Sequence, residues 1–147
     1  MATNLFVDLA LASVSHHDAT VPDLEAARFA DEPAFLRMAH EQFRGVILLQ
    51  TCNRVELLVQ GTGGVLAGFL KARGKTGYRV LEGEAVLRHL LELAAGIDSM
   101  IVGEDQILGQ LKEAAARSRE AGASSPVLDL CIDKAVHTGI RVREVTR

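Results

Sequence analysis

Two short apolar runs separated by a polar segment most constrain how this chain of 147 residues folds. The first run is Val46–Leu49 and the second is Leu57–Val59, and between them stands the sequence Gln50-Thr51-Cys52-Asn53-Arg54-Val55-Glu56. Apolar runs of this length, bounded by polar residues, are typical of short buried β-strands. The polar segment is therefore expected to lie where one strand ends, the chain turns and side chains reach solvent.

Within this segment Cys52 has a guanidinium two residues away, on Arg54, and a carboxylate two residues further on, on Glu56. Alternate residues of an extended chain point to the same side, so these three side chains can share one face. A neighbouring cation stabilises a thiolate, which is the nucleophilic form of cysteine. The pattern favours a cysteine nucleophile. The alternative is a small buried cysteine beside Thr51 and Asn53, which would only cap a turn.

Hydrophobic periodicity and capping residues predict the other elements. Strands are expected at residues 5–12, 46–50, 55–60 and 78–82, and helices at residues 21–30, 32–42, 65–72, 84–95, 105–120 and 125–147. This order predicts an α+β fold with a ferredoxin-like βαββαβ unit, in which an antiparallel sheet carries helices on one face and C-terminal helices follow. We place the unit at residues 1–103 and a helical extension at residues 104–147.

The composition limits the class of function. The formal net charge is −3, so a general nucleic-acid binder is not indicated, although basic residues late in the chain leave a contribution to nucleic-acid contact open. The two cysteines have no metal-binding spacing, and His16-His17 is expected in a turn. Cys131 falls on the apolar stripe of the last helix and is expected in the core.

No signal peptide or membrane span is visible, which favours a cytoplasmic protein with reduced thiols.

A second informative segment runs from Ala95 to Lys112 and contains Ser99, Gly103-Glu104-Asp105-Gln106 and Gly109-Gln110. Together with residues 51–56 it resembles the N-terminal domain of glutamyl-tRNA reductase, through that family's TCNR-x-E and G-x-x-S-x-x-x-G-E-x-Q-I-L-G-Q-x-K elements. The resemblance extends from Val7 to the chain end and is weaker before Leu48. The family's His-Lys-x-x-Pro-like element is matched poorly by residues 16–20, and Asp105 stands where the family often has proline.

The resemblance implies a reaction. Cys52 would attack the ester of glutamyl-tRNA(Glu), release the tRNA and hold the glutamyl group as a thioester. A hydride from NADPH would then give glutamate-1-semialdehyde, the first committed precursor of porphyrins and haem in the five-carbon route of tetrapyrrole synthesis. Covalent capture by a thiol divides one difficult step into two easier ones.

The resemblance also implies roles for individual residues. Cys52 and His89 would be catalytic, with His89 polarising the ester or orienting the substrate, as an acid or as a base. The substrate-binding residues would be Thr51, Asn53, Arg54, Ser99, Glu104, Asp105, Gln106 and Gln110. Arg54 would pair with a substrate carboxylate or hold the thiolate, and the sequence leaves both open. Glu104 would bind the substrate ammonium group.

The sequence contains no G-x-G-x-x-G turn between a strand and a helix, the signature of a dinucleotide-binding unit. The resemblance therefore implies that NADPH is held by a domain outside this chain. We expect the chain alone to form the thioester, or to act as an esterase, without making the aldehyde. A homodimer is expected of the full-length family member and not necessarily of this chain, and the aminomutase that follows in the route is a further expected partner. The alternatives are a non-catalytic tRNA-binding or regulatory paralogue, and a small interaction domain with inert cysteines.

Overall fold

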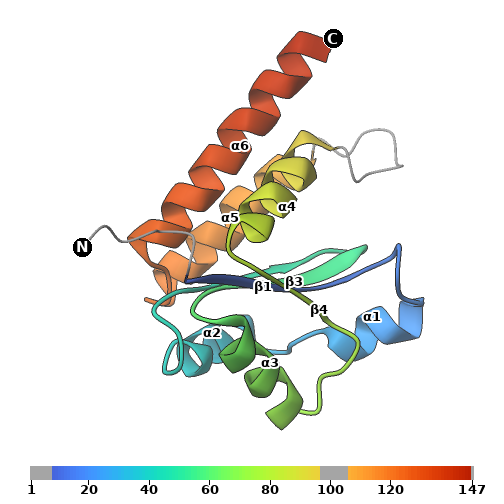
Figure 1. The fold of residues 1–147 in the computed structure, drawn as a ribbon, viewed down its shortest axis with the longest axis vertical. Helices are drawn as coiled ribbons and strands as arrows, with labels where there is room; N and C mark the ends of the chain where they lie inside the picture. Colours follow the sequence, from blue (N-terminus) through green and yellow to red (C-terminus); the bar gives the residue numbers. More distant parts are fainter. Residues whose placement is uncertain (1–7, 97–105, 147) are drawn as a thin grey trace.

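Four antiparallel strands stand at the centre of the computed structural model, which describes residues 8–96 and 106–146 (Figure 1). The strands are β1 (Leu9–Ser15), β2 (Val46–Gln50), β3 (Arg54–Gln60) and β4 (Arg79–Glu82). Their order in the sheet is β2-β3-β1-β4, and each neighbouring pair is antiparallel. Order and direction are those of a ferredoxin-like sheet, so the predicted α+β fold is confirmed.

Strand β1 ends at Ser15, later than the Ala12 that the sequence predicted. Its last residues stay in the sheet because Ser13 and Ser15 pair with Glu56 and Arg54 of β3. The Ser13 hydroxyl donates a hydrogen bond to Glu56 Oε2 at 2.8 Å. A polar residue is tolerated in a buried strand when it is hydrogen-bonded, and apolar alternation alone does not detect such a residue.

One face of the sheet is covered by α1 (Val21–Ala27), α2 (Glu32–Ala39) and α3 (Gly63–Ala72). Side chains of these helices share a core with the strand residues that point to this side, among them Ala12, Leu48 and Leu57. Asp31 caps α2 through a bond from the Ala34 N–H, as the sequence predicted. Helix α1 stops at Ala27, before the predicted Ala30, because the chain becomes extended at Arg28.

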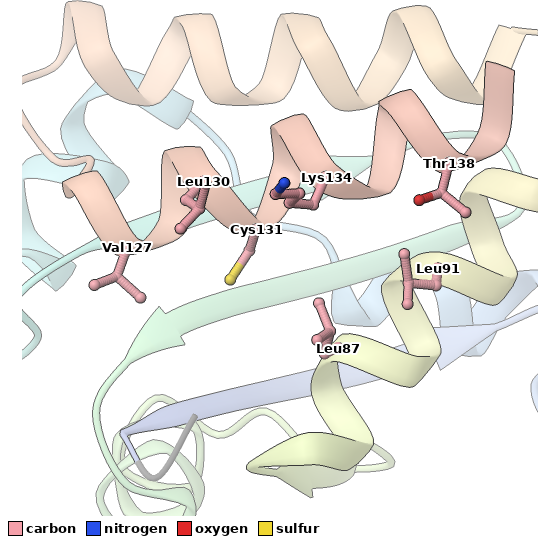
Figure 2. A pocket seen from close by; sticks show the side chains of 7 residues that line it. All are labelled: Leu87, Leu91, Val127, Leu130, Cys131, Lys134 and Thr138. Atoms are coloured by element: carbon pink, nitrogen blue, oxygen red, sulfur yellow. The ribbon is translucent and has the colours of Figure 1, made fainter. Parts of the chain in front are cut away.

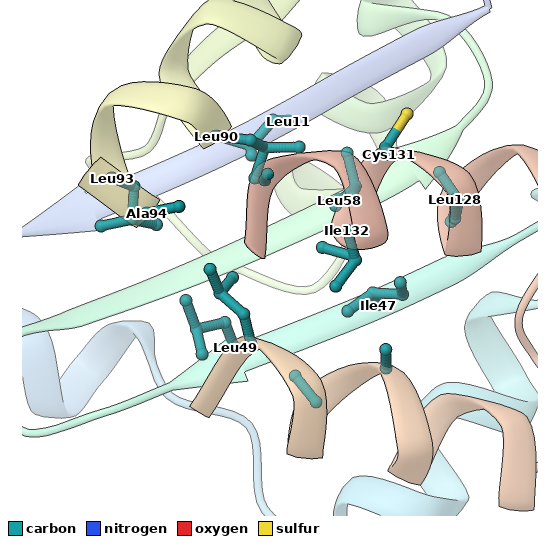
Figure 3. Packing of buried hydrophobic residues seen from close by; sticks show 14 of the residues in the cluster. Leu11, Ile47, Leu49, Leu58, Leu90, Leu93, Ala94, Leu128, Cys131 and Ile132 are labelled. Atoms are coloured by element: carbon teal, nitrogen blue, oxygen red, sulfur yellow. The ribbon is translucent and has the colours of Figure 1, made fainter. Parts of the chain in front are cut away.

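The opposite face is covered by α4 (Glu84–Ala95), α5 (Gln106–Glu120) and α6 (Pro126–Thr146). The prediction left the position of these helices on the sheet open. Leu11, Leu49 and Leu58 of the strands pack with Leu90 of α4 and Ile132 of α6 (Figure 3). Both faces of the strands are apolar, and a second helical layer buries the face that α1–α3 leave uncovered.

The predicted boundary after residue 103 lies outside the described residues, and the division of the chain there stays a prediction. Within the residues that the structure describes, no helix is both long enough and apolar enough to cross a membrane.

Helices α4 and α6 approach closely at Gly139. A Cβ atom at this position would lie 2.5 Å from the carbonyl oxygen of Ala94 and 2.7 Å from Leu108 Cδ2. Relieving that contact requires α4 to shift, so we expect Gly139→Ala to lower the free energy of unfolding by about 1–3 kcal/mol in a urea titration. Gly68→Ala is the matched control. Gly68 in α3 has open space around it, and this change should stabilise the chain by roughly 0.5–1 kcal/mol. Equal stability of G139A and wild type would contradict the close approach.

Candidate active site

The turn Thr51–Asn53 joins β2 to β3 and carries Cys52. The Thr51 N–H donates to the Arg54 carbonyl at 2.9 Å, and the Asn53 N–H donates to Thr51 Oγ1 at 3.2 Å. Cys52 is exposed, which excludes the alternative of a buried cysteine at this position. Cys52 lies in the turn and not in a strand. The alternation of side chains along a strand therefore does not place Cys52 on one face with Arg54 and Glu56, contrary to what the sequence predicted.

Groups from two other elements hold the backbone carbonyls on either side of Cys52. His16, which follows β1, donates its main-chain N–H to the Asn53 carbonyl at 2.8 Å. Arg28, which follows α1, donates from its guanidinium to the Thr51 carbonyl at 2.9 Å. The turn that bears the thiol is therefore fixed from both sides.

A buried polar cluster lies on the α4–α6 face of the sheet, at the end where this turn begins. Its centre is Glu56, whose Oε2 accepts hydrogen bonds from Ser13 Oγ at 2.8 Å and from the Arg54 guanidinium at 3.2 Å. His89 Nε2 lies 2.7 Å from the same oxygen and 3.0 Å from Oε1. Arg54 and Glu56 are each 3% exposed, and His89 is 10% exposed. The cluster thus joins His89 of α4 to the strand that follows Cys52.

Three neighbouring side chains and burial together set the charge of Glu56. Burial by itself would raise the pKa of the carboxyl, but the hydrogen bond and charge of His89, the charge of Arg54 and the Ser13 hydroxyl outweigh it. The pKa of Glu56 therefore lies below its ordinary value of 4.5. An ionised carboxylate only accepts hydrogen bonds, so His89 Nε2 must carry a proton. In a neutral His89 ring, Nδ1 is then the unprotonated nitrogen.

This lowered pKa predicts how stability depends on pH. Because Glu56 is more acidic in the folded chain, its contribution is complete above its ordinary pKa of 4.5 and is lost as the pH falls toward the folded value. Urea titrations at a series of pH values measure the difference in stability between wild type and Glu56→Gln. We expect this difference to shrink as the pH is lowered from neutrality to below the pKa that Glu56 has in the folded chain. Glu113→Gln, on the exposed side of α5, controls for the loss of one charge. A difference that does not change with pH would contradict the prediction.

Helix α5 begins at the end of the sheet where the Cys52 turn lies. Near its other end, Ser118 Oγ donates to the Val46 carbonyl at the start of β2, and the Val46 N–H donates to the Ala123 carbonyl at 2.8 Å. Helix α5 therefore runs opposite to β2. Gln106 is exposed and Gln110 is partly exposed on the first turns of this helix. Three predicted substrate-binding residues lie outside the described residues, and their positions stay predictions: Ser99, Glu104 and Asp105.

Cys131 occupies a different environment. It is 5% exposed, packs in the core as predicted, and lies beside a groove of about 350 Å³ between α4 and α6 (Figure 2). Burial raises the pKa of its thiol, which disfavours the nucleophilic thiolate. The groove is lined mostly by apolar side chains, including Leu87, Leu91 and Leu130, and by none of the predicted site residues. Among the described residues, no group of three His, Cys, Asp or Glu side chains is arranged to hold a metal ion.

Several side chains that shape this region had no role predicted from the sequence: Ser13, Arg28, Gln50 and Glu56. Glu56 had a usable signal, because a carboxylate inside an apolar strand must find a cation or several donors. His89, which interrupts the apolar pattern of α4, was the available partner. Arg28 had no such signal, since its bond to Thr51 joins elements that only the tertiary fold brings together.

Comparison with known proteins gives consistent results. Residues 12–146 match the family model described as glutamyl-tRNAGlu reductase, N-terminal domain. A glutamyl-tRNA reductase of Methanoculleus marisnigri is 63% identical over 141 residues, covering 96% of this chain and 33% of the relative. One of Methanoregula boonei is 57% identical over 138 residues, covering 94% of this chain and 32% of the relative. The solved glutamyl-tRNA reductase from Methanopyrus kandleri superimposes with a TM-score of 0.83 at 35% identity, over 94% of this chain and 35% of that one. The chain spans about a third of the length of the relatives it matches.

Proposed function

Since this chain belongs to the family of the glutamyl-tRNA reductase N-terminal domain, we propose that it captures the glutamyl group of glutamyl-tRNA(Glu) on Cys52. In a complete reductase this is the first half of the reduction to glutamate-1-semialdehyde, which feeds porphyrin synthesis. The observation that carries the proposal is an exposed thiol in a fixed turn beside a buried Arg54–Glu56–His89 cluster.

The proposed step is a transfer from oxygen to sulfur. The Cys52 thiolate attacks the ester carbonyl, a carbon–sulfur bond forms, and the bond between that carbon and the terminal ribose oxygen breaks. The ribose oxygen leaves with a proton, and the proton first held by the thiol is released, so no electrons are gained or lost. The product thioester is a more reactive acyl group than the ester because sulfur donates less electron density to the carbonyl.

His89 has the proposed role of assisting the attack on the ester: its neutral ring can accept the thiol proton at the unprotonated Nδ1, and a doubly protonated ring can polarise the ester carbonyl from Nδ1–H. The bond from Nε2 to Glu56 fixes the orientation of the ring and sets which nitrogen is protonated, as carboxylate partners do for functional histidines. Glu56 stays ionised at neutral pH because its pKa is lowered, so it stabilises a positive charge that develops on His89. Glu56 thereby acts through His89 and not on the substrate.

Charge complementarity supports the proposed substrate contacts. Glutamate esterified to tRNA keeps a side-chain carboxylate and an α-ammonium group. We assign the carboxylate to Arg54, whose planar guanidinium is held by Glu56, and the ammonium group to Glu104. The remaining proposed substrate contacts are Thr51, Asn53, Ser99, Asp105, Gln106 and Gln110.

The reduction step requires NADPH, and the described residues do not fit that cofactor. A dinucleotide-binding unit needs parallel strands joined by a helix, with a glycine-rich turn at the helix start. Every strand pairing within the described ranges is antiparallel. We therefore assign NADPH to a part of the reductase outside this chain, together with the proposed homodimer contact and the proposed transfer of the aldehyde to an aminomutase in the cytoplasm.

A trapping assay tests the proposal. The chain is mixed with tRNA charged with radiolabelled glutamate, without NADPH, and quenched in acid. We expect label on the peptide that contains Cys52, and release of that label by neutral hydroxylamine, which cleaves thioesters. The absence of label on a chain that binds glutamyl-tRNA would contradict the proposal and favour a tRNA-binding paralogue.

A further inference from the structure

An extended segment after α1 lies beside the end of β2 and is bound to it by a side chain. The side-chain amide of Gln50, the last residue of β2, bonds to both main-chain groups of Phe29. The Phe29 N–H donates to Gln50 Oε1 at 2.8 Å, and Gln50 Nε2 donates to the Phe29 carbonyl at 3.2 Å. Gln50 Nε2 also donates to Glu32 Oε1 at 2.8 Å. The segment is thus joined to the strand immediately before the Cys52 turn.

Arg28, the residue before Phe29, binds the backbone of the residue that follows Gln50. Its guanidinium donates to the carbonyl oxygen of Thr51 at 2.9 Å. That oxygen belongs to the planar peptide unit between Thr51 and Cys52, which also contains the Cα atom of Cys52. Holding the oxygen fixes the plane from which the thiol side chain projects. With the His16 bond to the Asn53 carbonyl, the backbone is held before and after the thiol.

The backbone of Arg28 is itself firmly anchored. Lys75 Nζ donates to the carbonyls of Ala26 and Arg28 at 2.9 and 2.6 Å, which places a cation at the C-terminus of α1. The Tyr78 hydroxyl donates to the Ala27 carbonyl, and burial raises the pKa of Tyr78, so this donor keeps its proton. The Arg28 side chain therefore bonds to the turn from a backbone that is itself held in place.

We propose that Arg28 is a positioning residue for the Cys52 nucleophile, acting through the Thr51 carbonyl. The inference rests on the proposed role of Cys52 and adds a residue outside the two sequence elements that carry the family resemblance. A displacement of about 1 Å in a reacting group can cost on the order of 10²-fold in rate. Loss of the Arg28 bond is expected to act on the rate of attack and not on the affinity for the tRNA.

The first test measures single-turnover glutamyl transfer with Arg28→Met, Arg28→Lys and the control Arg37→Met, which removes an exposed arginine of α2. We expect Arg28→Met to lower the rate constant at saturating glutamyl-tRNA by roughly 10-fold to 100-fold, with the half-saturating concentration unchanged. Arg28→Lys should recover part of the loss, because an ammonium group also donates to a carbonyl. A loss no greater than that of Arg37→Met, or a loss confined to the half-saturating concentration, would overturn the proposal.

The second test needs no substrate, so it separates this proposal from the proposed function. In a Cys131→Ala background, we expect Arg28→Met to speed amide exchange of residues 51–53 and to change the rate at which iodoacetamide alkylates Cys52, while Arg37→Met changes neither. Unchanged exchange and alkylation would overturn the positioning role. If the turn loosens in Arg28→Met but wild type forms no thioester, the proposed function fails and the structural link from Arg28 to the thiol stands.

Discussion

Replacing Cys52 by serine is expected to abolish the transfer of glutamate from glutamyl-tRNA to the chain. A serine hydroxyl is almost fully protonated at neutral pH and is a far weaker nucleophile than a thiolate. We expect the rate of acyl transfer to fall by at least about 10³-fold, as losses of a nucleophile in other enzymes do. Because Cys52 is exposed in a turn, the free energy of unfolding should change by less than about 0.5 kcal/mol. The measurement is the acid-stable label left on each variant after reaction with charged tRNA.

Cys131→Ser is the matched control for this substitution. It makes the same chemical change at a buried thiol, so it should keep the label and lower stability by about 1–3 kcal/mol, the cost of a hydroxyl placed in an apolar site. The two variants therefore have opposite expected effects on labelling and on stability. Label that is kept in C52S and lost in C131S would contradict the assignment of the nucleophile.

Strong local signals made most of the fold predictable from the sequence. Helix α4 was predicted with its observed bounds, because Glu84 begins an amphipathic pattern and Gly96, with a φ of 77°, ends it. Ser125 before Pro126 gave the start of α6, and the Leu128 N–H donates to Ser125 Oγ. The placement of α4–α6 on the second face of the sheet was left open, because apolar strand residues indicate burial without identifying the element that covers them.

The candidate site was predictable only in part. The turn signal placed Cys52 correctly between two strands. Arg54 and Glu56 share one face of β3 as expected, but Cys52, which was expected on the same face, lies in the turn. The surroundings of His89 were not, since an isolated helical histidine is more often half-exposed and this one is nearly buried against Glu56. Contacts between residues far apart in sequence, such as the bond from Arg28 to Thr51, depend on the assembled fold. The proposed substrate roles of Ser99, Glu104 and Asp105 stay predictions.

Glu56 gives the second large expected effect, and its consequences for stability and for chemistry can be separated. Glu56→Leu removes the carboxylate that neutralises the buried guanidinium of Arg54, and we expect the free energy of unfolding to fall by about 3–5 kcal/mol. Arg54→Met combined with Glu56→Leu removes both charges, and an apolar pair of similar size should recover much of that loss. Urea titrations of the two single variants and the double variant measure the recovery. A double variant no more stable than Glu56→Leu would show that the ion pair does not account for the loss.

The chemical role of Glu56 requires a variant that keeps the shape of the side chain. Glu56→Gln can still accept a hydrogen bond from His89, but it carries no negative charge to fix the protonated nitrogen. We expect glutamyl transfer to slow by roughly 10-fold to 100-fold, the usual effect of losing a carboxylate partner of a functional histidine. Nitrogen NMR of the His89 ring should show the proton on Nε2 in wild type and a mixture of the two neutral forms in Glu56→Gln. Slower transfer with an unchanged His89 spectrum would contradict a role exerted through the histidine, because the carboxylate would then affect the reaction by another route.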